Sequence, residues 1–189
     1  GAGLTGSFFL KEMIAYLHMK QENLIRTDIT VFDPGSIGKE DLGAVYIRED
    51  LGQIRALLLS ELLKEQYDYE VTAVPGDFSV GSPVLQISKR DYVFMVDCSD
   101  GSIPGDYRTE WKKLSAKRKL YLKFADATLY LDDGSGTEPF FSNTEEKSED
   151  FVWKHLERMF LVNLAMSKIV AVYEEGQIEC GTFCVNEKM

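Results

Sequence analysis

The sequence contains few of the residues that common catalytic sites require. It has 2 His and 3 Cys in 189 residues, and no Gly-x-Ser-x-Gly segment. A triad of nucleophile, histidine and acid therefore has no evident place in this chain. His18 and His155 both fall in segments with helical periodicity. We interpret them as partly buried or surface side chains rather than as ligands of a metal ion.

The cysteines are too few for a disulfide framework or a structural zinc site. Cys98, Cys180 and Cys184 make an odd, sparse set, which fits a reducing compartment, whereas zinc takes four ligands, usually in two close pairs. The first residues lack a basic leader followed by an apolar block, so we expect no signal peptide. The expected location is intracellular, in the cytoplasm.

Three further features are missing: a membrane-spanning run, a phosphate-binding glycine loop and an excess of basic residues. The longest apolar candidate, Phe151 to Tyr173, is interrupted by charged side chains. The glycine-rich segments at 76–81 and 133–136 lack the Lys-Ser/Thr ending of a phosphate loop and are interpreted as turns. The formal charge of −10 argues against a general binder of polyanions. It does not exclude a nuclease, because the metal site of a nuclease is itself made of acids.

The composition that remains is that of a globular protein. Hydrophobic residues make up 44% of the chain and charged residues 28%, which are ordinary values. The length predicts a single domain, 1–189. Within it we expect a helix and strand layer at 1–49, a core at 50–132, and a C-terminal helix and tail at 143–189.

Hydrophobic periodicity and turn residues predict an α/β fold, with a mixed central sheet flanked by helices. A long C-terminal helix is expected to cross one face of that sheet. Helices are predicted from Phe8 to Gln21 with Ser7 as cap, from Asp50 to Gln66, from Asp106 to Lys123, and from Asn143 or Thr144 to Tyr173. Strands are predicted over residues 28–32, 42–47, 69–74, 80–87, 92–96, 127–131 and 178–185.

One stretch combines a buried strand with candidate ligands. Tyr92 to Val96 are apolar residues in a row, which is typical of a central strand buried on both faces. Asp97, Ser99 and Asp100 follow at its carboxyl end, where open α/β sheets place their ligands. Two metal motifs, Asp-x-Ser-x-Ser and Asp-x-Asp, come close here and fail. The alternative is that Asp97 to Gly101 form only a turn.

The order of elements from Asp50 to Leu131 resembles the core of the PD-(D/E)xK nuclease superfamily, which is helix, strand, strand, strand, helix, strand. In that family an Asp opens the second strand, an acid ends the third, and a Lys follows two residues later. Asp77, after Pro75-Gly76, is similar to the first motif, and Asp97 is similar to the second acid. Glu61, or less favourably Glu65, would supply the acid of the helix.

The resemblance implies a site for Mg²⁺ or Mn²⁺ with Glu61, Asp77 and Asp97 as ligands. Such an ion takes oxygen ligands, and in this family the Lys positions or activates the attacking water. Ser99 stands where that Lys is expected. Some members of the superfamily carry the Lys on the following helix, so Lys112 or Lys113 would take this role.

Two functions follow from these patterns. The first is a nuclease-like domain, active or catalytically degenerate, in which a basic helix from Lys112 to Lys123 contacts the nucleic-acid backbone. The same basic run is also compatible with an ordinary solvated helix face. The second is a non-catalytic interaction or regulatory module that binds a protein partner through an acidic surface and the loop at Phe140-Phe141. Neither predicts a membrane association or an oligomeric state.

Overall fold

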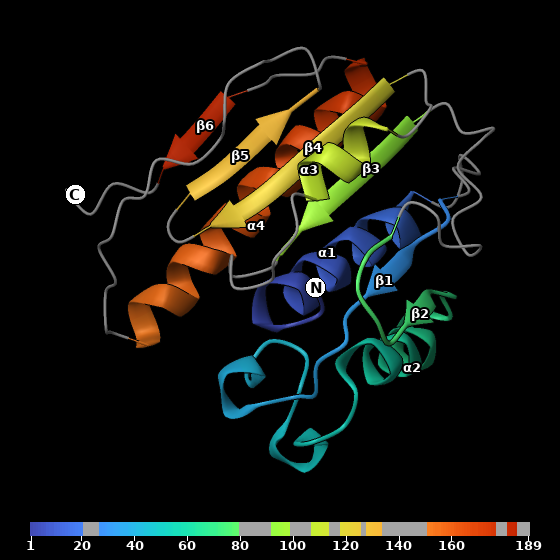
Figure 1. Ribbon diagram of the computed structural model, residues 1–189, viewed down its shortest axis with the longest axis vertical. Helices are drawn as coiled ribbons and strands as arrows, with labels where there is room; N and C mark the ends of the chain where they lie inside the picture. The colour runs from blue at the N-terminus through green and yellow to red at the C-terminus, as the bar shows by residue number, and fades with distance from the viewer. Residues whose placement is uncertain are drawn as a thin grey trace. The chain divides into compact units, whose positions relative to one another are not determined.

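The computed structural model describes residues 1–20, 27–79, 92–98, 107–113, 118–125, 128–133, 151–176 and 181–184. Its helices and strands form a mixed α/β protein, which confirms the predicted fold class (Figure 1). The contacts group into two compact units, Gly1–Leu85 and Gln86–Met189. We call them unit one and unit two and describe each by itself. The predicted core, 50–132, has residues in both units. That the whole chain forms a single domain stays a prediction.

Unit one is built on two helices and a pair of parallel strands. In chain order these are α1 (Leu4–Met19), β1 (Thr30–Phe32), α2 (Arg55–Tyr67) and β2 (Thr72–Val74), with short 3₁₀ turns at Lys39–Asp41 and Arg48–Asp50. Thr30 pairs with Thr72 and Phe32 with Val74. Parallel strands need a crossover connection, and α2 lies within it. The apolar core of this unit includes Leu10, Ile14, Ile37, Tyr46, Leu59, Leu63 and Val71.

Two predicted features of unit one are wrong. Ser7 is not the cap of α1, because the helix begins earlier, at Leu4. The hydroxyl of Ser7 is buried and donates to the carbonyl oxygen of Leu4 within the helix. The predicted strand over 42–47 is a series of turns, since Gly43 has φ +109°, outside the extended region.

The cap predicted for the second helix is also displaced. Asp50 lies in the 3₁₀ turn Arg48–Asp50, and its carboxylate accepts the backbone N–H of Ile47 at 2.7 Å. It therefore caps the turn, while α2 begins five residues later, at Arg55.

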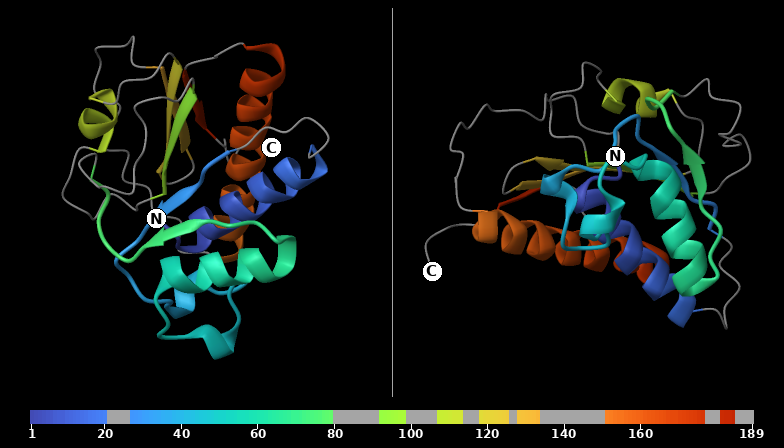
Figure 2. Two further views of the ribbon diagram at one scale, coloured as in Figure 1. Left: turned by 90° about the vertical axis from the view of Figure 1, so that its right-hand side faces the viewer. Right: turned by 90° about the horizontal axis from the view of Figure 1, so that it is seen from below.

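Unit two contains a four-stranded sheet in the described part of the chain, in the order β3-β4-β5-β6. The strands are β3 (Tyr92–Asp97), β4 (Arg118–Ala125), β5 (Thr128–Asp132) and β6 (Gly181–Cys184). β3 and β4 are parallel, and the other neighbours are antiparallel. Helix α3 (Tyr107–Lys112) and helix α4 (Phe151–Glu175) lie on opposite faces of this sheet (Figures 1 and 2).

The two faces of this sheet differ in chemistry because side chains alternate along each strand. On β4, Leu120, Leu122 and Phe124 are buried on one face, and Tyr121 and Lys123 point to the other. The apolar face is the one that α4 covers with a buried stripe, Leu161, Val162, Ala165, Met166, Ile169 and Val172. The polar face is the one that α3 covers.

Two predictions for unit two are wrong. The helix expected from Asp106 to Lys123 ends at Lys112, and residues from Arg118 onward form β4. The basic helix predicted as a nucleic-acid contact is therefore absent over the described residues. The apolar residues of β3 were expected to be buried, but Val93 to Val96 are half-buried. Among the described strands β3 has only β4 beside it. Since residues 80–91 lie outside the described ranges, the central place of β3 in the sheet stays a prediction.

Several predictions fall on residues outside the described ranges. They are the strand at 80–87, the start of the last helix before Phe151, and the Phe140-Phe141 loop. Of the helices described, none has both the length and the apolar composition that a membrane crossing requires.

Candidate functional site

Asp97 ends β3 as a buried carboxylate held by two donors. It is 6% exposed, and its Oδ2 accepts the hydroxyl of Tyr121 at 2.6 Å. The ammonium of Lys123 lies 3.1 Å from the same oxygen. Both charged side chains are only 5% exposed. We call Asp97, Tyr121 and Lys123 the polar triad.

The register of the sheet brings this triad together. β3 and β4 run in parallel with Asp97 opposite Lys123. Tyr121 is two residues before Lys123, so the period of two puts both side chains on the same face. A buried ion pair gains little over an apolar replacement, but removing one partner alone costs about 3–5 kcal/mol because it leaves an uncompensated charge. The triad therefore stabilises the pairing of β3 with β4 in this register.

Other side chains extend the polar face around the triad. On β5, Tyr130 pairs with Lys123, and Asp132 pairs with Tyr121. Asp132 is 3% exposed, so a second carboxylate is buried on this face. Trp111 of α3 is fully buried, with its ring centroid 5.7 Å from that of Tyr121. The face beneath α3 thus combines two acids, one amine and an aromatic cover.

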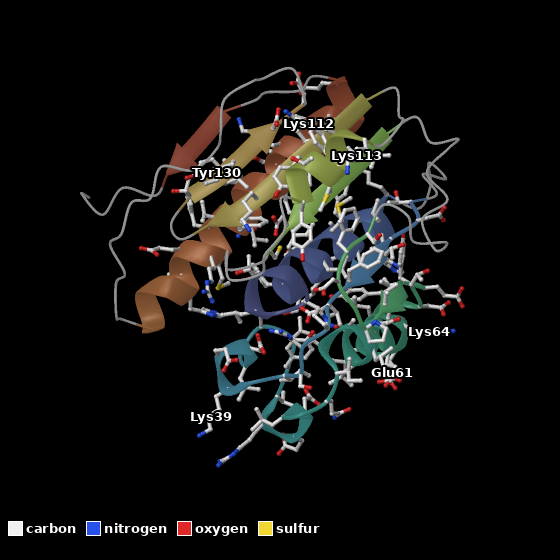
Figure 3. All side chains as sticks on the ribbon, viewed as in Figure 1. Lys39, Glu61, Lys64, Lys112, Lys113 and Tyr130 are labelled. Carbon is white, nitrogen blue, oxygen red and sulfur yellow. The ribbon has the colours of Figure 1, made fainter. Side chains whose placement is uncertain are left out.

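The predicted Lys residues lie at the end of α3, outside the polar triad. Lys112 is the last residue of α3, Lys113 follows in a turn, and both are exposed (Figure 3). Lys123, inside the range predicted as a basic helix, is instead buried against Asp97. Lys123 and Tyr121 are the site residues that sequence reasoning missed. The alternation of apolar and polar residues over 120–124 was the signal for the strand that positions them.

The other predicted ligands belong to unit one. Glu61 is exposed on α2, where it projects beside Lys64 (Figure 3). Asp77 is exposed after β2. Their convergence with Asp97 on one metal ion stays a prediction. Among the described residues, no group of three or more His, Cys, Asp or Glu is placed to hold a metal ion.

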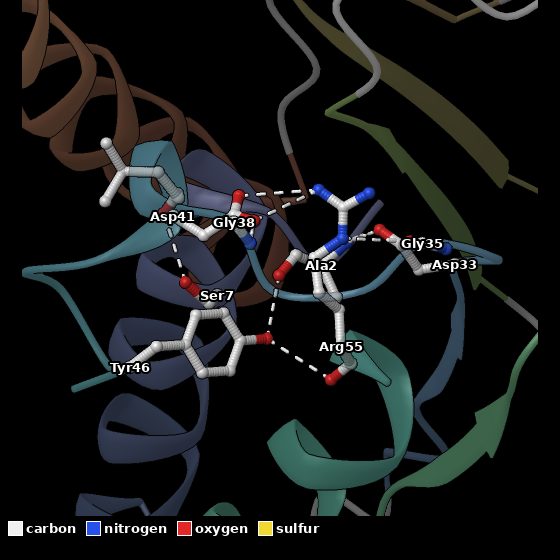
Figure 4. Close-up of polar contacts among 9 residues, drawn as sticks. Ala2, Ser7, Asp33, Gly35, Gly38, Asp41, Tyr46 and Arg55 are labelled. Atoms are coloured by element: carbon white, nitrogen blue, oxygen red, sulfur yellow. Dashed lines mark hydrogen bonds and ion pairs between the residues drawn. The ribbon is translucent and has the colours of Figure 1, made fainter. Parts of the chain in front are cut away.

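Unit one contains a second buried polar cluster, which the sequence did not indicate (Figure 4). Its centre is Arg55, at the start of α2. The Nε of Arg55 lies 3.2 Å from Asp33 Oδ1, and its Nη1 lies 3.4 Å from Asp41 Oδ1. Asp33 also accepts the backbone N–H of Ala2 at 2.6 Å and that of Gly35 at 2.7 Å. We call Arg55, Asp33 and Asp41 the Arg55 cluster.

Tyr46 ties the Arg55 cluster to the start of the chain. Its hydroxyl donates to the carbonyl oxygen of Ala2 at 2.8 Å. Burial, and then the negative charges of Asp33 and Asp41, raise the pKa of the Tyr46 hydroxyl far above its ordinary value. A Cβ at Gly35 would overlap the guanidinium of Arg55, so only glycine allows this close approach. Over the described residues, the contacts of the cluster join parts of unit one, which indicates a structural role.

A surface pocket lies in unit one, with a volume of about 350 Å³. Ala44, Val45 and Leu62 form its apolar lining, with Lys11, Glu65 and Gln66 around them. Glu65, the less favoured acid for the predicted metal site, is one of the residues that line this pocket.

Comparison with protein-family models and with curated proteins gives no match to this chain. The functional argument therefore depends on the geometry of the polar triad.

Proposed function

We propose that unit two is a nuclease-like domain that binds Mg²⁺ or Mn²⁺ through Asp97 and acts on nucleic-acid phosphodiesters. The observation that supports this most directly is the 3.1 Å contact between Lys123 Nζ and Asp97 Oδ2. The family that the chain resembles needs an amine beside the acid that ends this strand. Ser99 does not provide one, but Lys123 does so from the neighbouring strand.

The donors present are compatible with a hard divalent ion. Mg²⁺ is commonly held by one or two carboxylates and keeps several waters. Because Asp97 is only 6% exposed, binding of the ion there would require solvent to enter beneath α3. Asp132 is a second buried carboxylate on the same face. When bound, the ion would neutralise charge that develops on the phosphoryl group and lower the pKa of a bound water. The ammonium of Lys123 adds a fixed positive charge next to this position.

The roles proposed for the remaining predicted residues are separable by single variants. Asp77 and Glu61 would be further ligands, and Lys112 or Lys113 would contact a backbone phosphate. Asp77→Asn and Glu61→Gln should weaken metal binding only if unit one contributes to the site. Lys112→Met should weaken binding of nucleic acid without changing the affinity for the metal ion.

The experiment is cleavage of single-stranded and double-stranded DNA and RNA by the full chain with Mn²⁺. Asp97→Asn and Lys123→Met should each abolish Mn²⁺-dependent cleavage. The matched control is Asp68→Asn, which neutralises an exposed acid at φ +52°, a conformation that asparagine tolerates. Circular dichroism of every variant confirms that it is folded. Equal cleavage by wild type and Asp97→Asn would assign any activity to a contaminant. Absence of cleavage with retained Mn²⁺ binding would identify a degenerate site.

A second candidate function is a non-catalytic protein-interaction module. The observation that favours it is a pair of exposed apolar side chains one turn apart on α4, Leu156 at 50% and Phe160 at 56% exposure. Exposed apolar groups of this size often mark surfaces that bind another protein.

A further inference from the structure

The pocket in unit one lies between two helices and a turn. The residues that line it are Lys11 of α1, Ala44 and Val45 of the turn, and Leu62, Glu65 and Gln66 of α2. Glu65 and Gln66 follow Leu62 by three and four residues, so all three lie on one face of α2. The volume of about 350 Å³ is in the range of pockets that bind small molecules.

The apolar side of the pocket is continuous with the core of unit one. Val45 and Leu62 are partly buried against that core. The turn that carries Val45 is closed by a hydrogen bond from the N–H of Gly43 to the carbonyl oxygen of Tyr46 at 3.1 Å. Tyr46 is itself 1% exposed and bonded through its hydroxyl to Ala2. The pocket is therefore formed before a ligand binds, which favours binding because little ordering is then required.

Two opposite charges border the pocket without pairing with each other. Lys11 is half-buried and Glu65 is exposed. Neither side chain forms an ion pair with another of the described residues. Because both line one pocket of about 350 Å³, a small molecule that lies in it can reach the ammonium and the carboxylate together.

The end of α2 adds a second preference for a positive group beside Glu65. Glu65 lies in the last turn of α2 (Arg55–Tyr67), where the terminal carbonyl groups of a helix carry partial negative charge. Lys64, the basic residue of this turn, has its ammonium 3.0 Å from Glu70. A ligand ammonium at this side of the pocket is therefore stabilised by the carboxylate and by the helix end.

We propose that this pocket binds a small zwitterion, an α-amino acid with an aliphatic side chain. The carboxylate of the ligand pairs with Lys11, its ammonium pairs with Glu65, and its side chain packs on the apolar lining. The amide of Gln66 can donate to the carboxylate or accept from the ammonium. An acid alone or an amine alone leaves one of the two charges without its partner. This inference does not depend on the metal site in unit two.

An NMR titration of the full chain with compounds of one carbon skeleton tests the proposal. L-leucine carries both charges, isocaproate lacks the ammonium, isoamylamine lacks the carboxylate, and glycine lacks the apolar side chain. L-leucine should shift the backbone amide signals of the pocket residues at millimolar concentration, as expected for a ligand of few atoms. It should bind at least about tenfold more tightly than each of the other three compounds.

Two results would overturn the proposal. One is the absence of shifts at the pocket residues with L-leucine at millimolar concentration. The other is an affinity for isocaproate or isoamylamine that equals or exceeds the affinity for L-leucine, because the two charges would then not act together.

Single variants assign each charge to its part of the ligand. In Lys11→Met, L-leucine and isoamylamine should bind equally, since the carboxylate has lost its partner. In Glu65→Gln, L-leucine and isocaproate should bind equally. The matched controls, Lys39→Met and Glu49→Gln, remove the same charges at exposed positions outside the pocket lining and should retain the preference for L-leucine. The same spectra show whether each variant is folded. An unchanged preference in both pocket variants would contradict the proposal.

Discussion

Replacing Lys123 by methionine should destabilise unit two by about 3–5 kcal/mol. Methionine retains most of the aliphatic length and removes the charge. Asp97 would keep the hydroxyl of Tyr121 at 2.6 Å but would lose the ammonium of Lys123 at 3.1 Å. Because the carboxylate is 6% exposed, water cannot replace the ammonium at low cost.

The destabilisation caused by Lys123→Met should be smaller when Asp97 is neutralised in the same protein. In the double variant Asp97→Asn with Lys123→Met no charge is left unpaired, and the asparagine oxygen still accepts from Tyr121. The double variant should therefore be more stable than the sum of the single costs predicts. We expect a coupling free energy of about 2 kcal/mol, within the range found for residues in contact.

The pair Lys64–Glu70 is a control of nearly the same length and opposite burial. Its atoms are 3.0 Å apart, but the side chains are 60% and 83% exposed. Solvent screens such a pair, so the cycle with Lys64→Met and Glu70→Gln should give a coupling below about 1 kcal/mol. The comparison isolates the effect of burial from that of distance.

The assay is urea unfolding. Tryptophan fluorescence reports unit two, because both tryptophans, Trp111 and Trp153, lie in it. Unit one has no tryptophan, so the control pair is followed by circular dichroism, which reports the helices of both units. If Lys123→Met lowers the free energy of unfolding by less than about 1 kcal/mol, the claim of a buried Asp97–Lys123 pair is refuted. Such a small change is the value expected of a solvent-exposed pair.

Two further predictions concern the Arg55 cluster. Gly35→Ala should cost about 1–3 kcal/mol in urea unfolding, because its methyl group would displace the guanidinium of Arg55 from Asp33; Gly76→Ala, where no atom lies within 4 Å, should cost under about 1 kcal/mol. The raised pKa of Tyr46 means that the unfolded chain releases this proton first, so the free energy of unfolding should fall as the pH rises above about 10. Melting temperatures from pH 8 to about 11 should fall less steeply for Tyr46→Phe than for wild type, and parallel curves would contradict a buried, neutral Tyr46.

The sequence predicted those elements whose pattern is local. The apolar run of β3, the short apolar run of β5 and the long apolar segment of α4 each identify one element without knowledge of its neighbours. The position of Asp97 at the end of a strand followed in the same way. The helix predicted through Lys123 was wrong because its Lys and Arg residues favoured a solvated helix. The alternation of Leu120, Leu122 and Phe124 with polar residues was the stronger signal.

The polar contacts could not be predicted, because they depend on register between distant segments. Tyr121 is 24 residues from Asp97, and only the parallel pairing of β3 with β4 brings them together. The contact between Ala2 and Asp33 spans 31 residues. A local sequence pattern does not specify which distant residues come into contact. Strand register decides this, since a shift of one residue would turn Lys123 to the opposite face of the sheet.

The most direct test of the central claim is a calorimetric titration of the full chain with Mn²⁺. Wild type and Asp68→Asn should bind the ion with equal affinity, and Asp97→Asn should show no binding heat. Absence of binding by wild type, or equal binding by Asp97→Asn, would contradict the assignment of Asp97 as a metal ligand.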